Sequence, residues 1–299
     1  MNKSTLLILA AGMASRYGSM KQVDGFGPNG ETIIDYSIYD AIKAGFGKIV
    51  FVIKEEFLDR FKSTFDPKLA GRVKTDYAFQ TFDLKKYGID KEVERAKPWG
   101  TGHALLEAKD RIHEPFCVIN ADDFYGYEAF GKMVDFLNRQ TAENQYSLMG
   151  YQVGNTLSEH GSVSRAVCEV DANGNLTEII ERTKVYSKED NIVYEEDGKE
   201  IPIDASALVS MNFWAFTPAV FAATEKLFAE FVLQNADNPA AEFLIPLIAD
   251  HLIKNNNATF KVIPTTAKWF GVTYKEDKMI VQKNICDLIN AGIYPAKLW

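Results

Sequence analysis

Cysteine and histidine are both scarce in this 299-residue chain, which has three cysteines and four histidines. Cys117, Cys168 and Cys286 are odd in number, widely spaced and form no CxxC pair, which argues against a disulfide framework or a zinc knuckle. The histidines show no i, i+4 pair of the kind that holds a metal. No apolar run approaches the ~18 residues of a membrane span. We therefore expect a cytoplasmic protein with no membrane partner.

Long basic runs are also missing. The chain has 33 Lys and Arg against 41 Asp and Glu, a formal net charge of −8. This balance does not fit duplex nucleic acid, because neutralising phosphates supplies much of that affinity. It remains compatible with a small phosphorylated ligand, since a few cations in suitable positions make a local anion site. A hydrophobic content of 46% is ample for a packed core, so we expect an enzyme or a small-molecule binder.

One apolar run, residues 5–11, has two interpretations. With Lys3 before it and small residues after it, it could imitate a signal peptide, but it is at the short limit of the ~7–15 residues required. The same run is typical of a buried β-strand, and that is the interpretation we adopt.

The first half of the chain alternates short apolar runs with segments of helical periodicity. The predicted strands are 5–10, 48–53, 73–79 and 116–120, and the predicted helices are 32–44, 55–64, 102–111 and 127–139. Such alternation implies right-handed crossovers and a mainly parallel sheet.

After about residue 146 the pattern changes. The predicted strands are 147–153, 162–170, 175–181, 207–216 and 260–263, and the predicted helices are 218–234, 240–254 and 276–291. The polar, acidic segment 187–200 is expected to be an exposed loop or ribbon. The whole indicates an α/β fold with a Rossmann-like mixed, mainly parallel sheet flanked by helices, followed by a mixed second half.

The strongest local feature follows the first predicted strand: the segment 9–16 reads LAAGMASR and continues to Lys21. Small residues let a ligand approach the backbone closely. Backbone N–H groups, together with Arg16 and Lys21, would then attract a polyphosphate. The alternative is an ordinary strand–loop–helix connection with surface cations.

This segment resembles the N-terminal motif LAxGxGxR…K of the nucleotidyltransferases that activate sugar 1-phosphates. Met13-Ala14 stands where that family often has another glycine, and Met20 replaces the usual proline, but neither change removes a charge. The resemblance implies that Arg16 and Lys21 are catalytic cations on the triphosphate. It also implies that the nucleotide lies against Leu9, Ala10, Ala11 and Gly12.

Further matches occur in the order that the family has them. Segment 77–80 (YAFQ) resembles the strand whose glutamine, here Gln80, contacts the nucleobase. Segment 98–104 (PWGTGHA) resembles the turn that closes around the base, with Gly100 and Thr101. Segment 118–124 (VINADDF) resembles the acidic strand end that holds Mg²⁺, with Asp122 at the metal position.

The second half matches more loosely. The residues that the resemblance assigns to the acceptor are Gly161, Glu181, Arg182, Asn212, Trp214 and Glu242. Arg182 stands where the family has a lysine, which keeps the positive charge but changes its geometry. Taken singly, each of these residues also fits a purely structural role.

One departure concerns the metal. The family usually carries W-x-D-V-G-T near the C-terminus, and its Asp is the second metal ligand. Alignment from Trp269 places Gly271 at that Asp. Asp122 and substrate phosphates alone can hold a Mg²⁺ ion, which tolerates water ligands. Asp277 or Glu276 is the alternative second ligand, although either could instead cap the last helix, and Lys275 could reach a phosphate.

The resemblance implies a single domain, 1–299, of the nucleotide-diphospho-sugar transferase type. Its nucleotide-binding half is 1–145 and its acceptor-binding half is 146–299. The reaction it implies transfers a nucleoside monophosphate from an NTP to a sugar 1-phosphate or similar phosphoester, releases pyrophosphate and uses Mg²⁺. A phosphate monoester has a second pKa near ~6 and needs no general base.

Two alternatives stay open. A glycosyltransferase of GT-A-like architecture would use a nucleotide sugar and release a nucleoside diphosphate. A non-catalytic nucleotide-sensing subunit, suggested by Gly271, would bind nucleotide without turnover.

Overall fold

A computed structural model describes residues 3–12, 25–90, 93, 95, 97–158, 160–189, 191–271 and 277–299. Within these ranges, eleven strands form one mixed sheet, and two short strands, β5 (Asp123–Phe124) and β13 (Phe270–Gly271), pair separately. The strands of the large sheet are β1 (Thr5–Leu9), β2 (Lys48–Ile53), β3 (Lys74–Phe79), β4 (Phe116–Asn120), β6 (Gln145–Gln152), β7 (Val163–Val170), β8 (Leu176–Lys188), β9 (Asn191–Glu196), β10 (Lys199–Ile203), β11 (Leu208–Phe216) and β12 (Thr259–Thr265).

The order along the sheet is β10-β9-β8-β7-β11-β4-β1-β2-β3, with β6 joining β11 to β12. Strands β4, β1, β2 and β3 are parallel, whereas β11 is antiparallel to β4, β6 and β7. The ladders from β7 to β10 are also antiparallel. This arrangement confirms the expected α/β class, with a parallel first half and a mixed second half.

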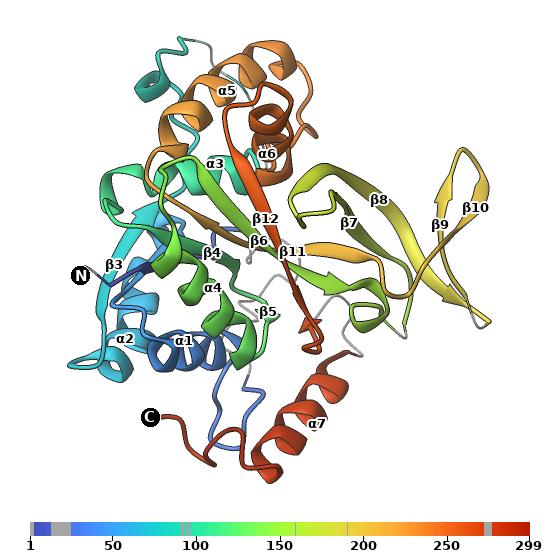
Figure 1. Cartoon of the computed structure of the whole chain (residues 1–299). Coiled ribbons are helices and arrows are strands. Elements are labelled where there is room, and N and C mark those ends of the chain that lie inside the picture. The colour runs from blue at the N-terminus through green and yellow to red at the C-terminus, as the bar shows by residue number, and fades with distance from the viewer. Residues whose placement is uncertain are drawn as a thin grey trace.

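Helices cover both faces of the sheet (Figure 1). Helices α1 (Ile33–Ala44), α2 (Leu58–Leu69) and α4 (Tyr127–Arg139) lie on one face, and α3 (Thr101–Glu107), α5 (Val220–Asn235) and α6 (Ile245–Lys254) lie on the other. The last helix, α7 (Asp277–Asn290), lies beyond the sheet near β5 and β13. None of the helices in the described ranges is long and apolar enough to cross a membrane.

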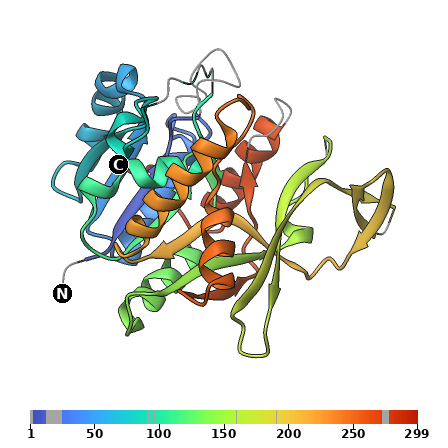
Figure 2. The same ribbon diagram turned by 90° about the horizontal axis from the view of Figure 1, so that it is seen from above.

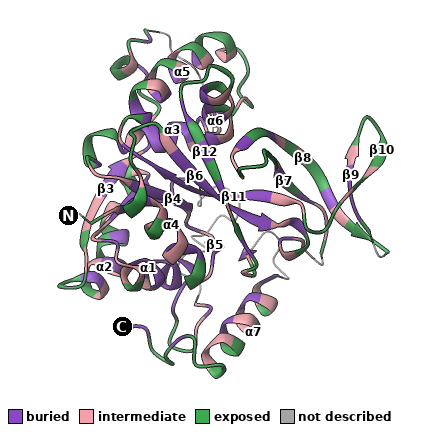
Figure 3. Ribbon diagram, viewed as in Figure 1, coloured by how far each residue is buried: buried purple, intermediate pink, exposed green. Residues whose placement is uncertain are grey.

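Strand β1 shows how the sequence builds this layering. All five of its residues are buried, as expected for a parallel strand covered on both faces. Figure 3 shows buried residues concentrated on the strands between the helices. Because side chains alternate along a strand, Leu6 and Ile8 pack in the core beneath α1, α2 and α4, while Leu7 packs in the core beneath α3, α5 and α6. The run 5–11 therefore contains a central strand, as we predicted.

Several boundaries differ from the predictions for local reasons. Helix α2 continues to Leu69 because Phe61, Phe65 and Leu69 form a buried i, i+4 face. Helix α6 begins at Ile245 rather than at residue 240, because the chain before it is extended and bonds to the loop at Trp99. The helix predicted for 102–111 ends at Glu107, followed by a 3₁₀ turn.

The acidic segment 187–200 is a ribbon. Strand β8 runs on to Lys188 and pairs with β9, which pairs with β10, so that this hairpin projects from the body of the protein (Figures 1 and 2). Its charges are paired across the strands, with Lys184 bonded to Glu195 and Lys188 Nζ 2.5 Å from Glu200 Oε2. The sequence prediction of a loop or ribbon is thus resolved as a ribbon.

The C-terminal segment returns to α1. Tyr294 Oη donates to Asp40 Oδ2 at 2.6 Å, and Trp299 Nε1 donates to Asp35 Oδ1 at 3.0 Å. These contacts and a small apolar cluster attach the C-terminal segment and α7 to α1. The last helix is consequently part of the framework behind β5 and β13.

Candidate functional site

A pocket of about 760 Å³ opens at the carboxyl ends of the parallel strands, where open α/β sheets bind ligands. Its wall combines the ends of β1, β3 and β4 with the loop before α3, strands β7, β8 and β11, the segment before α6, and Trp269. Residues from both halves of the chain therefore share one cavity. The residues selected from the sequence that line it are Leu9, Ala11, Gly12, Gln80, Gly100, Thr101, Asp122, Glu181, Asn212 and Glu242.

Other selected residues lie outside this lining. Ala10 is buried in the core beneath α1, and its N–H donates to Val52 O at 2.8 Å. Gly161 forms an isolated bridge with Ser158, next to the pocket-lining Ser162. Arg182 bonds to Glu196 on β9.

Two further candidates lie in the framework around the pocket. Trp214 is fully buried, and its indole Nε1 donates to Asn212 Oδ1 at 2.9 Å. Asp277 begins α7 and accepts a hydrogen bond from Ser158 Oγ at 3.2 Å. The loop residues Arg16 and Lys21, and the alternatives Lys275 and Glu276, lie outside the described residues.

The side-chain amide of Gln80 is fixed by its neighbours. Its Nε2 lies 3.1 Å from Gly100 O and 3.2 Å from His103 Nδ1. A carbonyl oxygen can only accept, so the nitrogen must be the atom that faces Gly100. If the second N–H is given to His103, both donors are used and Oε1 remains as the acceptor of this pocket residue.

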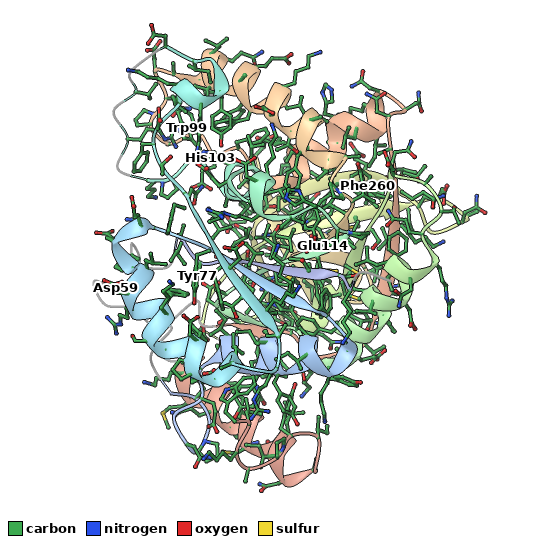
Figure 4. All side chains as sticks on the ribbon, turned by 90° about the vertical axis from the view of Figure 1, so that its left-hand side faces the viewer. Asp59, Tyr77, Trp99, His103, Glu114 and Phe260 are labelled. Atoms are coloured by element: carbon green, nitrogen blue, oxygen red, sulfur yellow. The ribbon has the colours of Figure 1, made fainter. Side chains whose placement is uncertain are left out.

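The nearby carboxylate of Glu107 favours the matching tautomer of His103. Its Nε2 lies 2.9 Å from Glu107 Oε1, and its ring stacks on Phe228 at 4.5 Å (Figure 4 labels His103 and the nearby Trp99). Burial lowers the pKa of His103 despite the nearby carboxylate. Burial alone would raise the pKa of Glu107, but His103 and Lys86 lower it overall. The pair is therefore a neutral imidazole and an ionised carboxylate, with Nδ1 free to accept from Gln80.

The glycine turn before α3 is shaped by the chain before α6. A Cβ at Gly100, whose φ is +105°, would lie 2.7 Å from Phe243 O, and one at Gly102 would lie 2.8 Å from the Phe243 ring. Phe243 N donates to Trp99 O, and Gly102 N donates to Phe243 O, at 2.6 and 2.8 Å. Only glycine permits this approach, which brings Glu242 to the pocket wall.

A chain of amides and carboxylates crosses the pocket floor. Asn120, at the end of β4, donates through Nδ2 to Asp123 Oδ2 at 2.9 Å and accepts through Oδ1 from Asn212 Nδ2 at 2.7 Å. Asn212 adopts a left-handed φ of +62° at an irregularity in the β11–β6 ladder. A buried hydrogen-bond network of this kind holds the acidic residues in one arrangement.

Asp122 and Asp123 form the acidic centre. Asp122 is partly exposed and lines the pocket, whereas Asp123 is buried. Burial, reinforced by the charge of Asp122, raises the pKa of Asp123 to about 7. A Cβ at Gly271 would lie 2.7 Å from Asp123 Oδ1, so the Asp123 carboxylate fills the space that a side chain at 271 would need.

Sequence reasoning missed Asn120, Arg165, Met211 and Trp269, all of which line the pocket. Asn120 lies within the segment 118–124, two residues before Asp122, and its position at the end of β4 was a usable signal. Arg165 lies within a strand, where no spacing distinguishes it from a surface cation.

A model of one protein family, described as nucleotidyl transferase, matches residues 7–238. The chain belongs to the nucleotidyl transferase family. The match covers the parallel strands, the acidic centre and most of the second half, including Glu181 and Asn212. It therefore favours nucleotidyl transfer over the glycosyltransferase and the non-catalytic alternatives, and the protein is a nucleotidyltransferase.

Solved structures show the same fold. A UDP-glucose pyrophosphorylase complexed with UDP-glucose is 15% identical, with a TM-score of 0.62 and 95% of this chain and 99% of that one covered. A glucose-1-phosphate thymidylyltransferase from Bacillus anthracis, described as putative and complexed with a sucrose, is 14% identical, with a TM-score of 0.62 and coverage of 95% and 96%.

A third structure, the inositol-1-phosphate CTP transferase from T. maritima, is 13% identical, with a TM-score of 0.60 and coverage of 95% and 97%. A search of curated protein sequences found no match. At these identities the solved structures establish the fold of this nucleotidyltransferase, and its substrates must be argued from its own pocket.

This family typically uses divalent metal ions. In the described part of the chain, no group of three or more His, Cys, Asp or Glu side chains is arranged to hold one. Among the described residues, Asp122 and Asp123 are adjacent acidic residues in the pocket lining.

Proposed function

We propose that this nucleotidyltransferase moves a nucleoside monophosphate from an NTP to a phosphorylated small-molecule acceptor, with sugar 1-phosphates as the first class to test, and releases pyrophosphate. One observation carries the proposal: Asp122 shares a single pocket with Gln80 from the first half of the chain and with Glu181 and Asn212 from the second. The names of the structural neighbours above contain UDP-glucose, glucose 1-phosphate and inositol 1-phosphate. These names support an acceptor of this class.

The nucleotide is assigned to the half 1–145. Leu9, Ala11 and Gly12 line the pocket at the end of β1, where small residues let a ligand approach the backbone. Gln80 presents Oε1 to a donor on the edge of the base, while Gly100 and Thr101 close that end of the pocket. Arg16 and Lys21 keep the triphosphate role that the sequence resemblance gives them.

Mg²⁺ fits the residues present. Asp122 offers the hard carboxylate oxygen that this ion prefers, and Mg²⁺ usually keeps water and substrate phosphates as its other ligands. Position 271 cannot supply a side chain, because Asp123 Oδ1 occupies that space. When bound, the ion would neutralise phosphate charge beside Asp122.

The reaction needs positioning more than proton transfer. An oxygen of the acceptor phosphate attacks the α-phosphorus of the NTP and forms a new P–O bond. The bond from that phosphorus to the bridging oxygen breaks, and the electron pair leaves with pyrophosphate. The second pKa of a phosphate monoester lies near ~6, so the attacking oxygen is already ionised at neutral pH. His103 is buried and tied to Glu107, and its role is to hold Gln80.

The acceptor is assigned to the half 146–299. Glu181 and Glu242 supply carboxylates that suit the hydroxyl groups of a small polyol. Asn212 is fixed by Asn120 and by Trp214, so Trp214 acts by orienting Asn212. Gly161 is proposed to shape the loop that presents Ser162.

We also place the enzyme in the cytoplasm. Cys117 and Cys168 are buried, and all three cysteines are unpaired, which is usual in a reducing compartment.

The test is a pyrophosphate-release screen. The wild-type protein is incubated with Mg²⁺ and each of UTP, dTTP, CTP, ATP and GTP, paired with glucose 1-phosphate, inositol 1-phosphate or phosphocholine. We expect release from at least one pair and none when the phosphorylated acceptor is replaced by its unphosphorylated alcohol. Asp122→Asn, with thermal unfolding as the folding control, should lower the rate at least ~100-fold. Nucleotide binding without turnover in any pair would contradict the proposal.

A further inference from the structure

Arg165, on β7, is a buried cation in the wall of the pocket. Only 7% of it is exposed, and it lines the cavity together with Glu181 and Asp123. Its guanidinium lies over the ring of Trp269, 4.7 Å from the centroid. The side chain is therefore fixed in position by an aromatic surface.

Part of its hydrogen-bonding capacity is used inside the protein. Nε donates to Thr156 Oγ1 at 3.0 Å, Nη1 donates to Ser164 O at 2.7 Å, and Nη2 donates to Thr156 O. A guanidinium has five N–H groups, so one remains on each terminal nitrogen. Two adjacent N–H groups of this kind match two oxygens of one phosphate.

Among the described residues, no carboxylate oxygen lies within 4.0 Å of the Arg165 nitrogens, although the charges of Asp123 and Glu181 act on the guanidinium from further away. Burial lowers the pKa of Arg165 to about 10, which still leaves it protonated at neutral pH. A buried charge without a paired counterion is costly, so this position favours an anion supplied from outside the chain.

Trp269 adds an independent observation. Its indole Nε1 is buried and has no hydrogen-bond partner among the described residues, and the residue lines the same pocket. A buried donor without an acceptor costs roughly 1–3 kcal/mol. Trp269 and Arg165 are thus neighbouring residues that each have hydrogen-bond donors with no acceptor among the described residues. The donor group of Arg165 is also charged.

The position of Arg165 favours the acceptor side. In the β7–β8 ladder, Ala166 pairs with Glu181, and both residues line the pocket. Arg165 itself pairs with Arg182, which instead stacks on Tyr194 at 4.6 Å and bonds to Glu196 in the projecting ribbon. Of these two paired arginines, Arg165 lines the pocket and Arg182 does not.

We propose that Arg165, with the indole N–H of Trp269 beside it, binds the phosphate group of the acceptor. This rests on the proposed function for the identity of the ligand, while the anion site itself does not. The sequence resemblance assigns the cation at position 182 to the acceptor, and this proposal gives the acceptor phosphate to the cation at position 165 instead. A fixed, stacked guanidinium also selects a phosphorylated acceptor over its free alcohol.

The first test is binding, which needs no turnover. Inorganic phosphate is titrated into the wild-type protein and into Arg165→Gln and Arg165→Lys, and binding is measured by calorimetry and by ³¹P line broadening. We expect Arg165→Gln to weaken phosphate binding about 100-fold, the loss of a charged two-point contact, and Arg165→Lys about tenfold. Equal phosphate affinity in all three proteins overturns the proposal, and this readout is unaffected if no substrate pair gives pyrophosphate.

The second test uses the substrate pair found in the pyrophosphate screen. Arg165→Lys should raise the acceptor KM about tenfold and leave the NTP KM within twofold. Arg72→Gln, whose guanidinium lies over Trp299 and not in the pocket lining, is the matched control and should change neither. A rise confined to the NTP KM, or a larger rise of the acceptor KM in Arg182→Gln than in Arg165→Gln, overturns the assignment.

Discussion

Gly271 and Asp123 face each other across the short β13–β5 ladder, and a Cβ on residue 271 would lie only 2.7 Å from Asp123 Oδ1. The same Cβ would lie 2.9 Å from the Trp269 ring. Real Cβ atoms do not approach other atoms so closely, so glycine at 271 and the buried carboxylate at 123 depend on each other. The absence of a carboxylate at position 271 is therefore linked to Asp123, whose carboxylate occupies the space that a side chain at 271 would need.

This dependence predicts strong coupling between the two positions. Gly271→Ala should destabilise the protein by about 1–3 kcal/mol, because an added methyl in a packed site forces its neighbours to move. In Asp123→Ala the carboxylate is absent, so adding Gly271→Ala should cost about 1 kcal/mol less than it does in the wild type. Urea unfolding of the two single variants and the double variant measures the coupling, and strictly additive free energies would contradict it.

The orientation of Gln80 predicts base selectivity. Gln80→Leu removes Oε1 and should raise the NTP KM about tenfold while leaving the acceptor KM unchanged. Glu107→Gln removes the anion that fixes the His103 tautomer, so His103 need no longer accept from Gln80 Nε2. Gly100 O then holds the amide by itself, and Oε1 is positioned less firmly against the base. The ratio of kcat/KM for UTP and CTP should then change at least ~10-fold.

Lys86→Ala is the control for this experiment, because Lys86 bonds to the same carboxylate from the surface. It should leave the UTP-to-CTP ratio within twofold. If Glu107→Gln lowers kcat/KM by the same factor for every NTP, the imidazole does not set the orientation of Gln80.

Asp40 predicts a pH dependence of stability. Burial raises its pKa to about 7, against the opposing effect of the hydrogen bond from Tyr294, and its Oδ1 has no hydrogen-bond partner among the described residues. Between about pH 4 and pH 7 the folded state holds this proton and the unfolded state does not. The free energy of unfolding should therefore fall as pH rises through this window, by up to ~4 kcal/mol from this group.

Asp40→Asn, which cannot ionise, should remove this part of the slope when urea unfolding is followed from pH 4.5 to pH 8. The slope will not vanish, since the pKa of Asp123 is also raised to about 7. An unchanged slope in Asp40→Asn would show that Asp40 is already ionised in the folded protein at low pH.

Local rules accounted for most of the fold and for the pocket-lining residues of the first half of the chain. The apolar run of β1, the glycine turn at Gly100 and the acidic residues after β4 are contiguous signals, and each lies where a strand or helix begins or ends. Their side chains meet because parallel strands end at one edge of the sheet.

The part of the pocket that we propose for the acceptor depends on pairings between distant segments, which no local pattern contains. Arg165 and Arg182 are opposed in one ladder, and only the three-dimensional arrangement shows that Trp269 covers one of them and Tyr194 the other. Strands β5 and β13 are two residues each, too short to give a periodic signal. The position of Gly271 against Asp123 is likewise visible only once these strands are paired.

The central claim is that the α-phosphoryl group of an NTP is transferred to a phosphorylated acceptor. The most direct measurement follows two labels, using NTP with ³²P at either the α or the γ position and the acceptor identified in the pyrophosphate screen. We predict that the α label appears in a nucleoside monophosphate joined to the acceptor phosphate and that the γ label appears in pyrophosphate, both lost in Asp122→Asn. Recovery of the γ label as inorganic phosphate, with the α label in a free nucleoside diphosphate, would contradict the account.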